Sequence, residues 1–216
     1  MDVKTLANQY RNELVDNVLP VWLEHAQDLE CGGYFTCLDR KGGVCDTDKF
    51  IWLQGREVWM FSMLYNKVEK RQEWLDCAVL GGEFLKKYGH NGDYNWYFSL
   101  NRSGRPLVEP YNIFSYTFAT MAFGQLSLAT GSQEYADIAK KTFEIILSKV
   151  DNPKGKWNKL HPDTRNLKNF ALPMILCNLA LEIEHLLDPD YLQLTMETCI
   201  HDVMNVFYRP GLGGII

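Results

Sequence analysis

Two kinds of helical segment alternate along this chain. One kind is apolar on nearly every side and the other has a single apolar face. A helix that is apolar all round is buried on all sides, whereas an amphipathic helix turns one face to solvent. The pattern therefore predicts an inner layer of buried helices and an outer layer of half-exposed ones. The expected inner helices are 49–66, 111–129 and 170–187, and the expected outer helices are 3–27, 71–88, 133–150 and 190–208.

Short polar segments rich in glycine separate these helices at a regular interval. Residues 34–42 match residues 97–104, a weaker third copy covers 155–163, and a fourth begins at 213–216. The spacing is about 60 residues, which is typical of a repeated supersecondary unit. We interpret each copy as a short β-hairpin that joins an outer helix to the next inner one, with Tyr34-Phe35-Thr36 as the first strand.

The two layers predict an all-α fold, an (α/α)6 toroid or barrel, and an open helical solenoid is the alternative. A closed toroid of this kind has about six inner helices, and three are visible here. The chain also stops at Ile215-Ile216, which reads as an apolar strand with no return strand, and free apolar edges are avoided. We therefore expect residues 1–216 to be the N-terminal half of a single barrel domain whose second half is absent from this chain.

Composition narrows the class of protein. The 216 residues are 46% hydrophobic and carry a formal net charge of −5, which argues against binding nucleic acid or an anionic membrane. No apolar run is long enough to cross a membrane and the first residues do not resemble a signal peptide, so we expect a cytoplasmic protein. The six cysteines lack C-x-x-C spacing, which favours reduced thiols over a metal site.

One face of the helix at 49–66 carries candidate chemistry. Trp52, Arg56 and Trp59 are spaced i, i+4, i+7 and share that face. Because an arginine is rarely buried without a partner, we expect the face to line an internal polar cavity. Indole rings can stack on a sugar while the guanidinium donates to its oxygen atoms. The alternative is a core helix in which Arg56 pairs with Glu57 or another buried acid.

The segment KFIWLQGREVWMFSMLYN at 49–66 resembles the signature of the N-acylglucosamine 2-epimerase family. GGYFTCLDRKG, YFSLNRSGRP and NFALPMILCNLALEI fit the same family in the same order. The resemblance implies an (α/α)6 barrel that interconverts sugars by removing the proton at C2, next to the carbonyl of the open-chain form. It also implies a small-molecule sugar substrate and a homodimer for the full-length protein. The carbonyl is itself the electron sink, so the reaction needs neither a metal nor an organic cofactor.

The resemblance also implies roles for particular residues. Arg56 would stabilise negative charge on the carbonyl oxygen, and Trp52 would line the pocket beside it. Phe114 and Tyr116 match positions near the pocket, although a core role suits them equally. Asn169 matches an asparagine of the family. In some cellobiose-type relatives a histidine lies four residues after that asparagine. Here that place is taken by Pro173, which favours the N-acylhexosamine branch, and Asn169 can also serve as a helix N-cap.

The catalytic histidines of the family belong to the second half of the barrel. The five histidines of this chain fall on helix ends, loops and polar helix positions, so we interpret them as surface or capping groups. We therefore expect this chain to be inactive on its own. An aldose–ketose isomerase, a cellobiose-type epimerase and a non-catalytic helical scaffold remain alternatives. A glycoside hydrolase would need two nearby carboxylates, and Glu57, Glu182 and Glu184 form no convincing pair.

Overall fold

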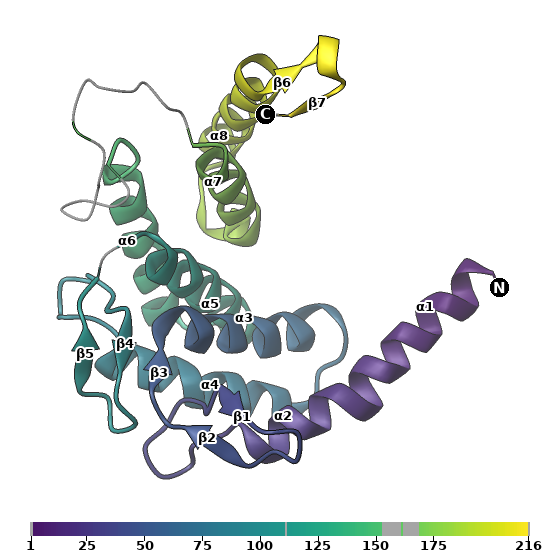
Figure 1. The fold of residues 1–216 in the computed structure, drawn as a ribbon, viewed down its shortest axis with the longest axis vertical. Helices are drawn as coiled ribbons and strands as arrows, with labels where there is room; N and C mark the ends of the chain where they lie inside the picture. Colours follow the sequence, from purple (N-terminus) through teal and green to yellow (C-terminus); the bar gives the residue numbers. More distant parts are fainter. Residues whose placement is uncertain (1, 111, 153–160, 162–168, 216) are drawn as a thin grey trace.

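A computed structural model describes residues 2–110, 112–152, 161 and 169–215 of the chain (Figure 1). Three helices lie in a row, with α5 packed between α3 and α7, and a further helix packs on each of them. The row consists of α3 (Ile51–Lys67), α5 (Phe114–Thr130) and α7 (Ala171–Glu182). The helices packed on it are α4 (Gln72–Tyr88), α6 (Gln133–Ser148) and α8 (Pro189–Asp202). The predicted alternation of inner and outer helices is confirmed.

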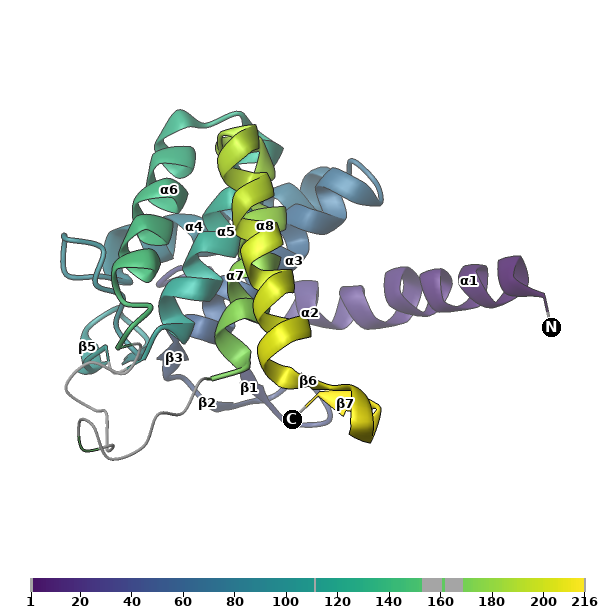
Figure 2. The same ribbon diagram turned by 90° about the horizontal axis from the view of Figure 1, so that it is seen from above.

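The N-terminal segment is one long helix that projects from the rest of the molecule (Figure 2). It comprises α1 (Val3–Asn12), a π-helical stretch η1 (Glu13–Val18) and α2 (Leu19–His25). Asp2 caps its first turn by accepting the Thr5 N–H at 2.9 Å. None of the residues of α1 is buried, whereas Val15 and Leu19 beyond it enter the core. The chain is therefore anchored from the π-helical stretch onward.

Short antiparallel strands join the helices. β1 (Cys37–Leu38) pairs with β2 (Val44–Asp46), and β3 (Lys49–Phe50), β4 (Ser99–Leu100) and β5 (Pro106–Val108) form one sheet. β6 (Tyr208–Arg209) pairs with β7 (Gly214–Ile215). The C-terminal part also contains the single-turn helices η3 (Glu184–Leu186) and η5 (Pro210–Leu212) and a second π-helical stretch, η4 (Val203–Phe207). The first two predicted hairpins are present, and the third copy at 155–163 lies almost wholly outside the described residues.

The first predicted strand, Tyr34-Phe35-Thr36, is wrong, because regular pairing begins at Cys37. Tyr34 makes an isolated bridge to Gln27. Its backbone is satisfied by a side chain instead: the Gln54 amide accepts the Tyr34 N–H and donates to the Tyr34 carbonyl oxygen, both at 2.8 Å. The Gln54 amide thus takes the place of a neighbouring strand.

The expectation of an unpaired strand at the end of the chain is also wrong. β7 pairs with β6, which places Ile215 opposite Tyr208. The chain reverses at Gly213, whose φ of 63° is a left-handed conformation that glycine adopts without steric cost. A strand with its partner already beside it gives no evidence for a missing second half.

A buried cluster of charges holds the start of α3. The Lys49 ammonium donates to the Asp28 carboxylate at 2.9 Å and to the carbonyl oxygens of Gly32 and Arg102. The Arg102 guanidinium binds the same carboxylate through two donors at 2.9 and 3.0 Å. Lys49 is 0% exposed and Asp28 is 1% exposed, so each charge depends on the others for its solvation. The cluster fastens α3 to the loops on both sides of it.

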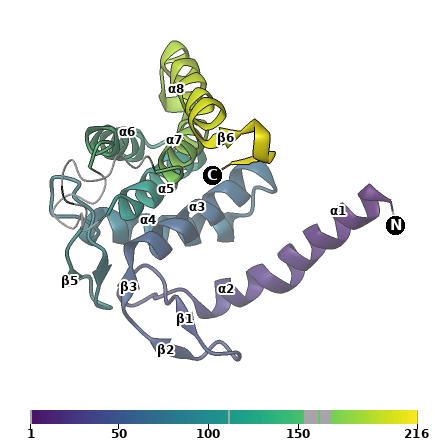
Figure 3. The same ribbon diagram turned by 45° about the horizontal axis from the view of Figure 1, so that its top comes forward.

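Apolar side chains remain exposed at both ends of the helical row. They include Val3 and Tyr10 on α1, Met174 and Leu181 on α7, and Leu194 on α8. Figure 3 shows α1 and α8 at the margins of the molecule. Within the described part of the chain, no helix combines the length and the hydropathy required to cross a bilayer.

Removing the Asp28 carboxylate should destabilise the fold strongly. Asp28→Ala leaves the Lys49 ammonium buried without a counter-charge, and breaking a buried pair in this way costs about 3–5 kcal/mol. Urea unfolding followed by circular dichroism measures the loss. Glu144→Ala is the matched control, because it breaks an exposed pair with Lys141 and should change the free energy of unfolding by less than about 1 kcal/mol. Equal effects of the two substitutions would contradict a structural role for the cluster.

The exposed apolar faces should make the 216-residue chain self-associate when it is produced by itself. Sedimentation velocity should show species larger than a monomer, in proportions that depend on concentration. The double substitution Met174→Lys and Leu181→Lys places two charges on the exposed part of α7 and should reduce the association. A monomer at every concentration tested would refute the prediction.

Candidate functional site

Arg56 lies in the second turn of α3 with an exposed side chain. Its guanidinium carbon is 5.9 Å from the centre of the Trp52 ring and 5.3 Å from that of Phe118, a residue of α5. Among the described residues, no carboxylate lies within ion-pair distance of the guanidinium, so the alternative pairing with Glu57 is not observed. The exposed position also differs from the expected internal cavity. Arg56 is therefore held by aromatic rings.

The two tryptophans predicted to share a face with Arg56 have different surroundings. Trp52 is half-buried and its ring centre lies 6.1 Å from that of Phe118. Trp59 donates its indole N–H to the Glu182 carboxylate on α7 at 2.9 Å. The same carboxylate oxygen accepts from the Gln125 amide on α5 at 3.1 Å. These bonds tie α3, α5 and α7 together, which gives Trp59 a structural task in addition to any contact with a ligand.

Phe114 and Tyr116, two other predicted site residues, differ from each other in exposure. Phe114 begins α5 and is 47% exposed. Tyr116 is 1% exposed, and its hydroxyl donates to Asn95 at 3.2 Å and accepts from the Lys149 ammonium at 2.8 Å. Burial raises the pKa of the Tyr116 hydroxyl to about 12. The Tyr116 hydroxyl is thus engaged within the protein, and its predicted contact with substrate stays a prediction.

Asn169 is exposed at the start of α7, where its side-chain oxygen accepts the Ala171 N–H at 2.9 Å. This bond satisfies one of the free N–H groups of the first helical turn. Pro173 falls in the same turn, where its missing N–H is tolerated. The N-cap position itself belongs to Phe170, so Asn169 accepts from the first turn of α7 from one residue earlier than predicted. A role of Asn169 towards substrate stays a prediction.

Glu57 follows Arg56 in sequence but points into the interior. It is 5% exposed, and its Oε1 atom has no hydrogen-bond partner among the described residues. Burial raises the pKa of this carboxyl from 4.5 to about 8, so the group is mostly protonated at neutral pH. A neutral Glu57 cannot neutralise Arg56, and the positive charge of the arginine stays available.

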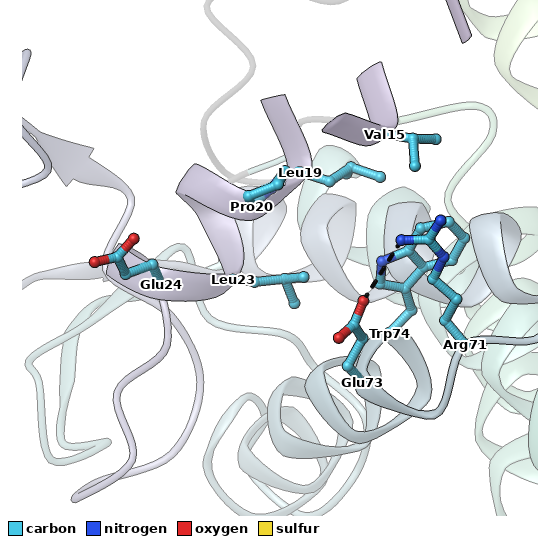
Figure 4. Close-up of a pocket in the computed structure, with 8 residues that line it drawn as sticks. All are labelled: Val15, Leu19, Pro20, Leu23, Glu24, Arg71, Glu73 and Trp74. Carbon is cyan, nitrogen blue, oxygen red and sulfur yellow. Dashed lines mark ion pairs between the residues drawn. The ribbon is translucent and has the colours of Figure 1, made fainter. Parts of the chain in front are cut away.

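A cavity of about 380 Å³ lies between the N-terminal helix and α4 (Figure 4). Its floor includes Val15, Leu19 and Leu23, and at its rim the Arg71 guanidinium lies 4.9 Å from the Trp74 ring centre and 3.8 Å from the Glu73 carboxylate. None of the predicted site residues lines this cavity. It is separate from the surface around Arg56.

The arrangement of helices has counterparts among solved structures. A sugar epimerase from a ruminal bacterium superposes with a TM-score of 0.82 at 20% sequence identity, over 97% of this chain and 57% of that one. A likeness at this identity establishes the fold. The chain forms an incomplete (α/α)6 barrel of alternating inner and outer helices joined by short β-hairpins.

Sequence comparison defines the family. Residues 33–209 match the family model described as N-acylglucosamine 2-epimerase, and the chain belongs to this family. The N-acylglucosamine 2-epimerase of Bos taurus is 40% identical over 174 residues, which are 78% of this chain and 41% of that protein. The cellobiose 2-epimerase of Dictyoglomus turgidum is 27% identical over 168 residues, which are 73% of this chain and 42% of that protein. The chain thus spans less than half the length of these two relatives.

The Glu57 carboxyl should make stability depend on pH. Between its ordinary value of 4.5 and its folded value of about 8, the folded state binds more protons than the unfolded state. The contribution of Glu57 to the free energy of unfolding should therefore fall as pH rises through this window. Urea unfolding of the wild type and of Glu57→Gln at about pH 5 and about pH 8.5 measures it, because the neutral amide does not titrate. The substitution should gain stability relative to the wild type at the higher pH, and an unchanged difference would contradict the assignment.

Proposed function

We propose that this chain is the N-terminal half of a sugar epimerase that inverts C2 of an N-acylhexosamine, of the N-acylglucosamine/N-acylmannosamine type. The observation that carries the proposal is Arg56: it is exposed and has neither an ion pair nor a hydrogen bond among the described residues. The family supports the class of reaction. Identity of 40% to an N-acylglucosamine 2-epimerase, against 27% to a cellobiose 2-epimerase, supports the N-acylhexosamine branch.

The guanidinium would act on the open-chain form of the sugar. It donates to the carbonyl oxygen at C1, which makes the neighbouring C2–H more acidic. A base removes that proton, the C–H electron pair moves into the C1–C2 bond, and negative charge develops on the oxygen that Arg56 holds. A proton then returns to the opposite face of C2, and the charge on oxygen reverts to a carbonyl.

The proton-transfer groups must sit on both faces of C2 and titrate near working pH, which suits histidines. We place these histidines in the second half of the barrel, as the family resemblance implies. On the half described here, Trp52 and the exposed ring of Phe114 would contact the sugar, with Asn169 at the start of α7 and Tyr116 shaping the site from behind. The full-length protein would be a homodimer, and residues 1–216 alone would be inactive.

A second candidate is an aldose–ketose isomerase of the same family. It shares the deprotonation at C2, on a sugar that carries a hydroxyl there. It differs in that a proton returns to C1 while the C2 hydroxyl gives up its proton to become the carbonyl, and the oxygen at C1 gains a proton to become a hydroxyl. The products separate the two candidates, since epimerisation yields the other aldose and isomerisation yields a ketose.

Arg56→Ala should reduce turnover by about 10²–10³, the typical effect of removing one oxyanion donor. The assay follows deuterium exchange at C2 of N-acetylmannosamine in deuterium oxide by NMR. The enzyme is residues 1–216 co-expressed with the second half of the Bos taurus relative, and residues 1–216 alone serve as the inactive reference.

The midpoint of urea unfolding provides the control for this experiment. Arg56 is exposed and has no polar partner in the described part of the chain, so Arg56→Ala should leave the midpoint nearly unchanged. Arg56→Lys keeps the charge but changes the donor geometry, and should recover only part of the rate. If Arg56→Ala exchanges C2 as fast as the wild type, the arginine has no part in the chemistry. If the completed barrel shows no exchange at all, the chain is better described as a helical scaffold.

A further inference from the structure

The orientation of the Arg56 guanidinium is fixed by an unusual set of contacts. An arginine side chain has several rotatable bonds, and in most sites carboxylates or carbonyl oxygens fix its orientation by accepting its N–H donors. None of the described residues supplies such an acceptor to Arg56. The contacts that orient it are the faces of two rings, Trp52 from one turn earlier on α3 and Phe118 from α5.

Phe118 reaches Arg56 because α3 and α5 approach closely at Gly55. A Cβ atom built on Gly55 would lie 2.8 Å from the Phe118 carbonyl oxygen, 2.9 Å from its carbonyl carbon and 3.0 Å from its Cβ. The two nearest of these atoms are backbone, so they cannot rotate away. A glycine in the middle of a helix is unfavourable relative to alanine. Here it permits the contact that brings the Phe118 ring to the residue directly after it.

We propose that Phe118, admitted by Gly55, is a positioning residue for Arg56, and that ring contacts orient the guanidinium while leaving all of its N–H donors free for an anionic or carbonyl oxygen. A carboxylate in the place of Phe118 would hold the arginine equally well but would occupy those donors and cancel the charge. The contact of the Trp52 and Phe118 rings with Arg56 is observed whatever the reaction is. Its use in catalysis rests on the proposed epimerase function.

The mobility of the Arg56 guanidinium tests the proposal without an activity assay. Rotation about the Nε–Cζ bond can be measured by ¹⁵N NMR on the 216-residue chain, with the Arg56 signal assigned by its loss in Arg56→Lys. Phe118→Leu should speed this rotation about two- to fivefold, the factor that corresponds to an exposed cation–π contact. Phe118→Tyr keeps the ring and should match the wild type. Gly55→Ala should behave like Phe118→Leu, because it forces the two helices apart.

The matched control is Phe123→Leu, which removes a wholly buried ring from the same helix. It should lower the midpoint of unfolding and leave the Arg56 rotation unchanged. Equal rotation in Phe118→Leu and the wild type, or an equal increase in Phe123→Leu, would overturn the proposal. In the completed barrel, Phe118→Leu should also slow C2 exchange, with recovery in Phe118→Tyr. If no variant exchanges C2 but Phe118→Leu still frees the guanidinium, the proposed function fails and the positioning role stands.

Discussion

The close approach of α3 and α5 is the constraint on which the rest of this structure depends. At Gly55 the backbone of one helix lies against the other with no room for a methyl group. Helices that pack so closely exclude water from the side chains around them, and Phe61 of α3 and Ala119 and Ala122 of α5 belong to the buried core. The same contact decides which ring stands beside Arg56. Packing and chemistry in this chain are therefore set by one steric feature.

The polar groups of the molecule divide into those that hold the fold and those that remain available. Asp28, Lys49 and Arg102 satisfy one another at the start of α3, and Glu182 is engaged by Trp59 and Gln125 between the three inner helices. Glu57 is made neutral by burial. Arg56 has no polar partner among the described residues and lies over two aromatic rings. Its charge is therefore available, which is the condition that a charge-stabilising group must meet.

Hydrophobic periodicity was sufficient to predict the helices and their two layers, because the spacing of apolar residues shows whether a helix is buried on all sides or on one side. It could not predict that the Gln54 amide replaces a strand beside Tyr34, since that contact depends on a loop folding back over twenty residues. Nor could it find Phe118. A glycine inside a buried helix was a signal of close approach, but only the packed structure shows which residue of which neighbour lies against it.

The strands also decide how firmly successive repeats are joined. β3 pairs with β4, so main-chain hydrogen bonds connect the segment before α3 to the hairpin before α5, whereas β6 and β7 pair with each other alone among the described strands. α7 and α8 bury few residues, and α7 meets α3 and α5 largely through side chains. With so few residues buried on α7 and α8, we expect the third repeat to open locally more readily than the first two.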